Sequence, residues 1–151
     1  LKIFSKKINY VIFRMFNVYG PGQDLKNLRQ GMVSIYLAQA LRNKKIVVRG
    51  SLNRVRDFIY IDDVVDVWVK SLNKNIKNET FNLSTGKATS VKNLLNYITK
   101  LIPGTVILKR NSTRGDQLKS VGNIKKLNRI FKKNFLPIQD GLKLFFKSIK
   151  I

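Results

Sequence analysis

The 151-residue sequence contains no cysteine and no histidine. Without cysteine there can be no disulfide and no thiolate metal site, which fits a cytoplasmic protein. Without histidine the chain lacks the commonest general base and the commonest zinc ligand, and it cannot form a Ser-His-Asp triad by itself. We therefore expect no metal site in this chain.

Long hydrophobic runs are also missing. No apolar stretch reaches about 18 residues, so we predict no membrane span. Residues 1–7 (LKIFSKK) are too short and too interrupted by lysine for a signal peptide. Hydrophobic residues still make up 44% of the chain, which is enough for a folded core. The length fits one domain or part of a larger one.

Acidic residues are scarce: 8 stand against 30 basic ones, for a formal charge of +22. This balance favours an anionic partner, which could be nucleic acid, a phosphorylated small molecule or an acidic surface. The basic residues are spread along the whole chain, and only short clusters occur, such as Lys125-Lys126 and Lys132-Lys133. We therefore do not expect nucleic acid to be the main partner.

Segments with strand periodicity alternate with segments of helical periodicity, which predicts the α/β class. The expected strands cover residues 8–14, 46–48, 57–61, 80–84 and 106–108. The expected helices cover residues 32–41, 64–73, 91–101, 124–131 and 142–149, and residues 1–7 are expected to end another helix. Ser90 is the expected N-cap of the third of these five helices.

The central stretch 54–65 (RVRDFIYIDDVV) places Arg54 and Arg56 just before a strand that runs into a helix. A guanidinium in such a loop can hold a phosphate with two hydrogen bonds. The other interpretation is that both arginines pair with nearby aspartates. In the helix that follows, we expect Trp68 to lie in the core. Asn17 follows the strand 8–14, at an end where ligands bind in parallel α/β sheets.

Four ordered motifs then resemble the NAD-dependent nucleotide-sugar epimerases and dehydratases of the extended short-chain dehydrogenase/reductase family. Residues 14–23 (RMFNVYGPGQ) resemble that family's R-x-x-N-V-Y-G-P-x-Q segment. Residues 56–64 (RDFIYIDDV) resemble R-D-F-x-Y-V-x-D-V, and residues 81–86 (FNLSTG) are similar to F-N-L-G-T-G. Residues 114–116 (RGD) resemble R-P-G-D without its proline.

The resemblance covers only the C-terminal half of a family member. It implies the C-terminal part of an extended Rossmann-type fold, comprising the last parallel strands and the small substrate-binding domain. The family's glycine-rich NAD loop, catalytic Ser or Thr and Tyr-x-x-x-Lys pair belong to the other half. No tyrosine of this chain is followed four positions later by lysine. We therefore expect no catalytic residue here, and NAD as cofactor by resemblance alone.

The resemblance implies that three polar residues handle the substrate. Asn17 matches an asparagine that contacts the substrate diphosphate. Arg56 and Arg114 match two arginines that neutralise this diphosphate from opposite sides. Such roles are chemically sensible, because a buried diphosphate needs positive charge and directed hydrogen-bond donors.

The same resemblance assigns five further positions. Met32 and Val33 match a helix start whose backbone lies near the diphosphate, and helix N-termini favour anions. Arg49 falls where family members place a residue beside the nucleotide base. Met15 and Phe16 fall near the nicotinamide of NAD.

We expect the chain to be the substrate-binding portion of such an enzyme, with a UDP-hexose 4-epimerase as the leading hypothesis. Reductase and dehydratase activities remain open, and so does a homodimer in the complete enzyme. The alternative is a non-catalytic remnant or binding module for nucleotide-sugars or polyanions.

Overall fold

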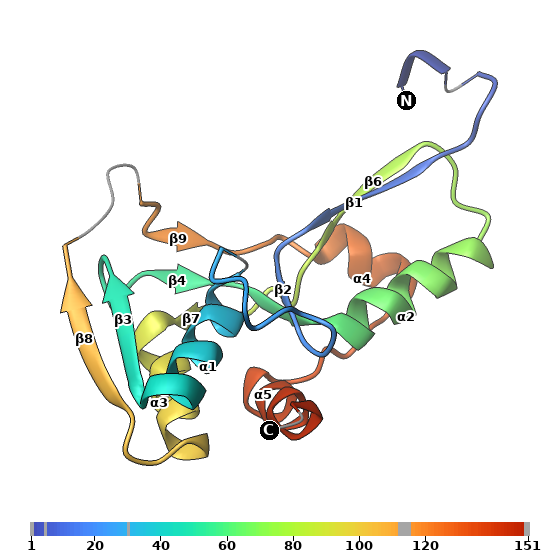
Figure 1. Cartoon of the computed structure of the whole chain (residues 1–151). Helices are drawn as coiled ribbons and strands as arrows, with labels where there is room; N and C mark the ends of the chain where they lie inside the picture. The colour runs from blue at the N-terminus through green and yellow to red at the C-terminus, as the bar shows by residue number, and fades with distance from the viewer. Residues whose placement is uncertain (1, 5, 30, 112–115, 150–151) are drawn as a thin grey trace.

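The computed structural model describes residues 2–4, 6–29, 31–111 and 116–149 (Figure 1). The helices are the short 3₁₀-helix η1 (Lys2–Phe4) and the α-helices α1 (Met32–Asn43), α2 (Ile61–Leu72), α3 (Val91–Leu101), α4 (Lys125–Phe131) and α5 (Ile138–Ser148). The strands are β1 (Val11–Met15), β2 (Asn17–Tyr19), β3 (Lys45–Arg49), β4 (Val55–Arg56), β5 (Phe58–Tyr60), β6 (Glu79–Leu83), β7 (Thr89–Ser90), β8 (Val106–Arg110) and β9 (Lys119–Ser120).

The strands of the described residues form four small sheets. Strands β1 and β6, β2 and β5, and β3 and β8 pair in parallel. Strand β4 lies between an antiparallel neighbour, β7, and a parallel one, β9. Helices lie between successive parallel strands in the chain, as the crossover of a parallel pair requires. The predicted α/β class is confirmed.

Two hydrophobic cores hold these sheets. The larger core joins α1, β3, α3 and α5, on the left and at the bottom of Figure 1. The smaller core joins β5, α2, β6 and α4, toward the right of the same view. Strands β2 and β5 carry the chain from one core to the other, so residues at their ends lie where the two cores meet.

Local sequence signals placed several elements correctly. Helix α3 has the bounds expected from its periodicity, and the Ser90 hydroxyl accepts a hydrogen bond of 3.1 Å from the Asn93 N–H, as an N-cap should. Helix α1 begins at Met32 as expected and continues two residues past Leu41. At the N-terminus the expected end of an α-helix is wrong: the structure has only the three-residue η1.

The central strand is shorter than the sequence suggested. It is divided at Asp57 into β4 and β5, and it ends at Tyr60 instead of Ile61. Asp62 and Asp63 therefore lie in the first turn of α2 and do not precede it. Their negative charges still lie near the positive end of the helix dipole, and this attraction stabilises the N-terminus of α2.

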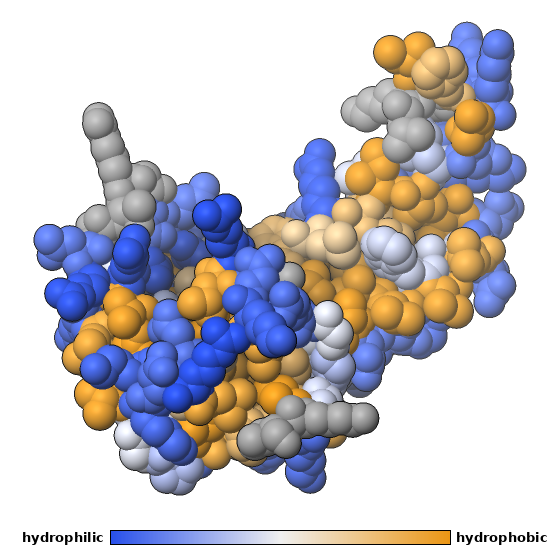
Figure 2. Space-filling model, viewed as in Figure 1, coloured by the Kyte–Doolittle hydropathy of each residue, from blue (hydrophilic) through white to orange (hydrophobic). Residues whose placement is uncertain are grey.

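Trp68 does not lie in the core, contrary to the expectation. Its side chain is 49% exposed and Leu72, one turn later, is 82% exposed, whereas Val64 and Val67 are buried. One face of α2 packs against β5 and β6. Within the described residues, β6 is the only strand that pairs with β1. Figure 2 shows the resulting hydrophobic surface over β1 and α2.

Helix α5 is anchored to β2 by a glycine contact, and this contact yields a test. A Cβ atom at Gly141 would overlap the Tyr19 hydroxyl and lie 3.2 Å from Tyr60 Cδ2. Alanine is the better helix former by about 1 kcal/mol. Overpacking nevertheless costs about 1–3 kcal/mol, so we expect Gly141→Ala to lower the free energy of unfolding.

The measurement is urea unfolding followed by circular dichroism. Lys143→Ala, at an exposed position of the same helix, is the matched control and should change stability little. A Gly141→Ala protein as stable as the parent would contradict the packing described here.

Candidate substrate-binding site

Asn17 opens β2 directly after the carboxyl end of β1. Its side-chain Nδ2 donates a hydrogen bond of 2.8 Å to the backbone oxygen of Asp57. The register of the parallel pair β2–β5 places Asn17 beside Phe58. Asn17 is therefore fixed against the junction of β4 and β5, one residue from Arg56.

Arg54 and Arg56 converge on one carboxylate, that of Asp116. Arg54 Nη1 pairs with Asp116 Oδ2, and Arg56 Nη2 lies 3.1 Å from Asp116 Oδ1. Arg56 Nη1 also donates to the backbone oxygen of Val55 at 2.9 Å. The interpretation that these arginines pair with aspartate is thus confirmed. The partner, however, lies about 60 positions away and is not the neighbouring Asp57 or Asp62.

Arg54 is the more deeply anchored of the two arginines, with 7% of its surface exposed. Its Nη2 lies 3.5 Å from the hydroxyl of Tyr36 on α1. Burial raises the pKa of Tyr36, while the neighbouring Arg54 opposes this rise. Gly50 allows the close approach: a Cβ there would lie 2.5 Å from both Arg54 Nη1 and Asp116 Oδ2, and its φ of +85° favours glycine.

Asp57 is fully buried and holds three chain segments together. Its carboxylate accepts hydrogen bonds from the Thr85 N–H (2.8 Å), the Thr85 hydroxyl (2.7 Å), the Gly86 N–H (2.8 Å) and the Gly122 N–H (3.3 Å). Every donor is neutral, so the carboxylate serves as an acceptor for the turn after β6 and the segment before α4. This arrangement fits a structural role for Asp57, and no chemistry need be assigned to it.

The start of α1 lies beside β2. The N-cap is Gly31, and no side chain of the described residues caps the helix there. A Cβ atom at Gly31 would lie 3.9 Å from the Val18 backbone oxygen. Val33 is buried, so it could reach a ligand only through its backbone, whereas Met32 is half-buried. The free N–H groups of this first turn are suited to an anion.

The remaining positions lie at two other strand ends. Arg49 is exposed at the carboxyl end of β3, in register with Arg110 of β8. Met15, at the carboxyl end of β1, is half-exposed, and the Phe16 N–H donates to the Leu83 backbone oxygen at 3.1 Å. Met15 and Phe16 thus follow β1, at the carboxyl end of the parallel pair β1–β6.

The structure places Asn17 next to the β4–β5 junction that carries Arg56 and the start of α1 beside β2, but Arg114 lies outside the described residues. Two contributors were not anticipated, Tyr36 and Asp116. Tyr36 carries the periodicity of a core residue, and its hydroxyl reaches Arg54 only through the packing of α1. Asp116 lies in a motif that was noticed for its arginine.

A model of the NAD dependent epimerase/dehydratase family matches residues 4–84 of this chain. The chain belongs to this family. A Methanocaldococcus jannaschii protein provisionally named UDP-glucose 4-epimerase is 35% identical over 138 residues, which are 90% of this chain and 44% of that protein. The ADP-L-glycero-D-manno-heptose-6-epimerase of Brachyspira hyodysenteriae is 31% identical over 99% of this chain and 50% of its own length.

Among solved structures, the Thermotoga maritima UDP-glucose 4-epimerase with UDP-glucose matches with a TM-score of 0.89 and 29% identity. The match covers 97% of this chain and 48% of that one. This likeness confirms the predicted part of an extended Rossmann-type epimerase fold. The chain spans about half the length of the relatives it matches.

Within the described residues, no group of three or more acidic side chains is placed to hold a metal ion. None of the described helices is both long and apolar enough to cross a membrane.

The role given to Asp57 can be tested with Asp57→Asn. The asparagine amide has one oxygen in place of two, so its NH₂ group would face N–H or O–H donors of Thr85, Gly86 or Gly122. Those donors would then lack an acceptor. Hydrogen bonds to a charged acceptor are worth about 1.5–3 kcal/mol each, so we expect a loss of about 3 kcal/mol or more.

Equilibrium urea unfolding measures this loss. Asp140→Asn is the control, because Asp140 forms only an exposed pair with Lys143, at 3.2 Å. That pair should contribute no more than about 1 kcal/mol. Equal effects of the two substitutions would refute the structural role of the Asp57 carboxylate.

Proposed function

We propose that this chain is the nucleotide-sugar-binding portion of an NAD-dependent epimerase/dehydratase, most specifically one that acts on a UDP-hexose as a 4-epimerase. The observation that carries the proposal is that Asn17 bonds to the β4–β5 junction next to Arg56, while the start of α1, which no described side chain caps, lies beside β2. An amide, a guanidinium and free backbone N–H groups are the donors that a diphosphate requires. Relatives named as sugar epimerases support this choice of substrate class.

In the proposed complex Arg56 binds the diphosphate through its planar fork, and Asn17 orients a phosphate oxygen. Arg114 supplies a second positive charge from the opposite side. The backbone of Met32 and Val33 offers N–H groups, and Arg49 lies toward the nucleotide base. These residues bind and orient the substrate, which allows the sugar to react at a fixed position.

NAD fits the carboxyl end of β1, where half-exposed Met15 and partly buried Phe16 offer apolar contacts to a nicotinamide ring. When bound, NAD supplies the acceptor and donor of hydride in this reaction class. The residues of this chain would hold the ring and exclude water from one side of it.

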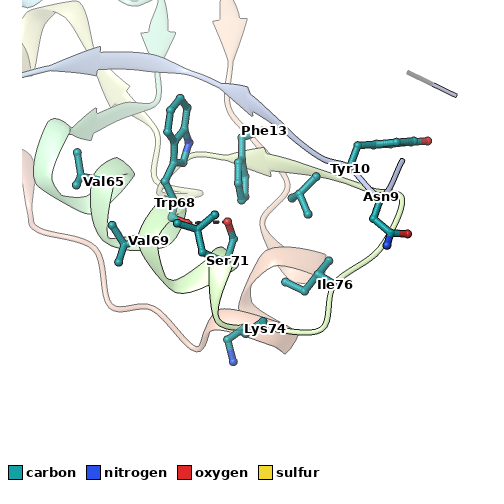
Figure 3. Close-up of a pocket in the computed structure, with 11 residues that line it drawn as sticks. Asn9, Tyr10, Phe13, Val65, Trp68, Val69, Ser71, Lys74 and Ile76 are labelled. Atoms are coloured by element: carbon teal, nitrogen blue, oxygen red, sulfur yellow. Dashed lines mark hydrogen bonds between the residues drawn. The ribbon is translucent and has the colours of Figure 1, made fainter. Parts of the chain in front are cut away.

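We further propose that residues 1–151 are the C-terminal portion of the family fold and that the NAD-binding half lies outside them. Support comes from an apolar groove of about 640 Å³ between β1 and α2 (Figure 3). Phe13, Trp68 and Val69 line this groove. Such an uncovered apolar face next to the free edge of β1 suits a further parallel strand and its helix.

The 151-residue chain alone is predicted to show no turnover of UDP-glucose or UDP-galactose with NAD. The physical reason is that it contains no Tyr-x-x-x-Lys pair to move a proton. A coupled NADH assay and chromatography of the UDP-sugars would measure this. Turnover by the purified chain, free of contaminating enzyme, would overturn the proposal that the catalytic residues lie outside residues 1–151.

If Arg56 binds the diphosphate, Arg56→Ala should weaken UDP binding by about 1.5–3 kcal/mol, the value of a charged hydrogen bond. Arg114→Ala should act alike, and lysine at either position should restore binding only in part. Isothermal titration with UDP measures these affinities, with thermal melts recorded in parallel.

Arg129→Ala is the matched control, because Arg129 is an exposed arginine on α4 for which no ion pair occurs with a described residue. Lys133 is unsuitable as a control, since its amine lies 2.9 Å from Asp63 and 2.8 Å from Asp66. If Arg56→Ala and Arg129→Ala bind UDP equally well, the diphosphate assignment is wrong.

A further inference from the structure

Asp116 is shared by two arginines that differ in their surroundings. Arg54 is 7% exposed and is held on its other side by the Tyr36 hydroxyl at 3.5 Å. Arg56 contacts Asp116 at 3.1 Å and, among the described residues, otherwise the backbone oxygen of Val55, and its side chain is 12% exposed. Arg54 thus has two side-chain partners, Asp116 and Tyr36, whereas the described side chain that Arg56 contacts is that of Asp116.

The cluster also carries more positive than negative charge. Two guanidinium groups face one carboxylate, and the Nε of Arg54 is buried without a hydrogen-bond partner among the described residues. Burying uncompensated charge is unfavourable, so an anion that arrives at this cluster gains from it.

We infer that Arg54 is a positioning residue that keeps Asp116 paired while Arg56 turns from Asp116 to the substrate phosphates. This inference rests on the function proposed above. Without Arg54, the departure of Arg56 would leave the 21%-exposed Asp116 side chain with no cation among the described residues. With Arg54 in place, the carboxylate stays neutralised and Arg56 exchanges one anionic partner for another.

The local backbone supports this arrangement. Gly50 is needed beside the Arg54–Asp116 pair, because a Cβ there would lie 2.5 Å from atoms of both side chains. The backbone oxygen of Arg54 accepts a hydrogen bond of 3.0 Å from the Val91 N–H at the start of α3. Arg54 is thereby tied to α1 through its side chain and to α3 through its backbone, which leaves it little freedom to follow a ligand.

A double-mutant cycle on UDP binding tests the inference. Arg54→Gln should lower UDP affinity about ten-fold, or about 1.4 kcal/mol, since Arg56 would then have to abandon an unpaired carboxylate. Asp116→Asn should bind UDP at least as tightly as the parent, because Arg56 is no longer engaged. The double variant should bind like Asp116→Asn alone, and Arg54→Lys should lie between Arg54→Gln and the parent.

The outcomes separate the alternatives. If Arg54 contacted the phosphates directly, the double variant would bind more weakly than Asp116→Asn. If Arg54 served only the fold, Arg54→Gln would lower the melting temperature and leave affinity unchanged, and Asp116→Asn would bring no rescue. Either result overturns the inference.

The same titrations show whether the proposed function itself fails. In that case Arg56→Ala and the parent would bind UDP alike, and the inference would fall with it. If Arg56→Ala weakens UDP binding while Arg54→Gln binds UDP as tightly as the parent, the inference is wrong and the proposed function still stands.

Discussion

The buried carboxylate of Asp57 is the constraint on which the site depends. It accepts four hydrogen bonds, from Thr85, Gly86 and Gly122, and its own backbone oxygen accepts one from Asn17. These contacts join the β4–β5 junction, the start of β2, the turn after β6 and the segment before α4. Asp57 stands between β4, which ends at Arg56, and β5, so its hydrogen bonds fix the backbone next to Arg56. The proposed binding residues Asn17 and Arg56 are therefore positioned by a residue to which no ligand contact is assigned.

Because acidic residues are scarce, several of the carboxylates take part in more than one ion pair or hydrogen bond. Asp63 and Asp66 both pair with Lys133, and Asp63 also accepts a hydrogen bond from the Leu136 N–H. Asp116 serves two arginines, because the chain has 8 acidic residues for 30 basic ones. An excess of cations on the surface costs little in water, but the same excess in a half-buried cluster creates a demand for an anion. The binding proposed above therefore depends on the local charge of this cluster and not on the overall value of +22.

The sequence predicted what local patterns determine. Periodicity and capping placed α1, α3 and the Ser90 cap, since these depend on residues a few positions apart. The pairing of Arg54 and Arg56 with Asp116 could not be foreseen, because it spans about 60 positions and accompanies the pairing of β4 with β9. Trp68 was misplaced for a related reason: helical periodicity shows which residues share a face, but not whether another element covers that face.

The uncovered face of α2 makes contacts of its own with α4, the segment that follows α4, and β1. The ion pairs of Lys133 hold the first two turns of the helix, and the ring of Phe13 on β1 stacks on Trp68 with a centroid distance of 6.4 Å and an interplanar angle of 21°. A partner that binds a preformed surface loses less conformational entropy than one that must order it. Residues such as Trp68 and Leu72 would be unfavourable on a permanently exposed helix, yet they are suitable for a surface that another part of the fold buries. The internal contacts of this face, together with its apolar composition, therefore support the proposal that the NAD-binding half packs against β1 and α2.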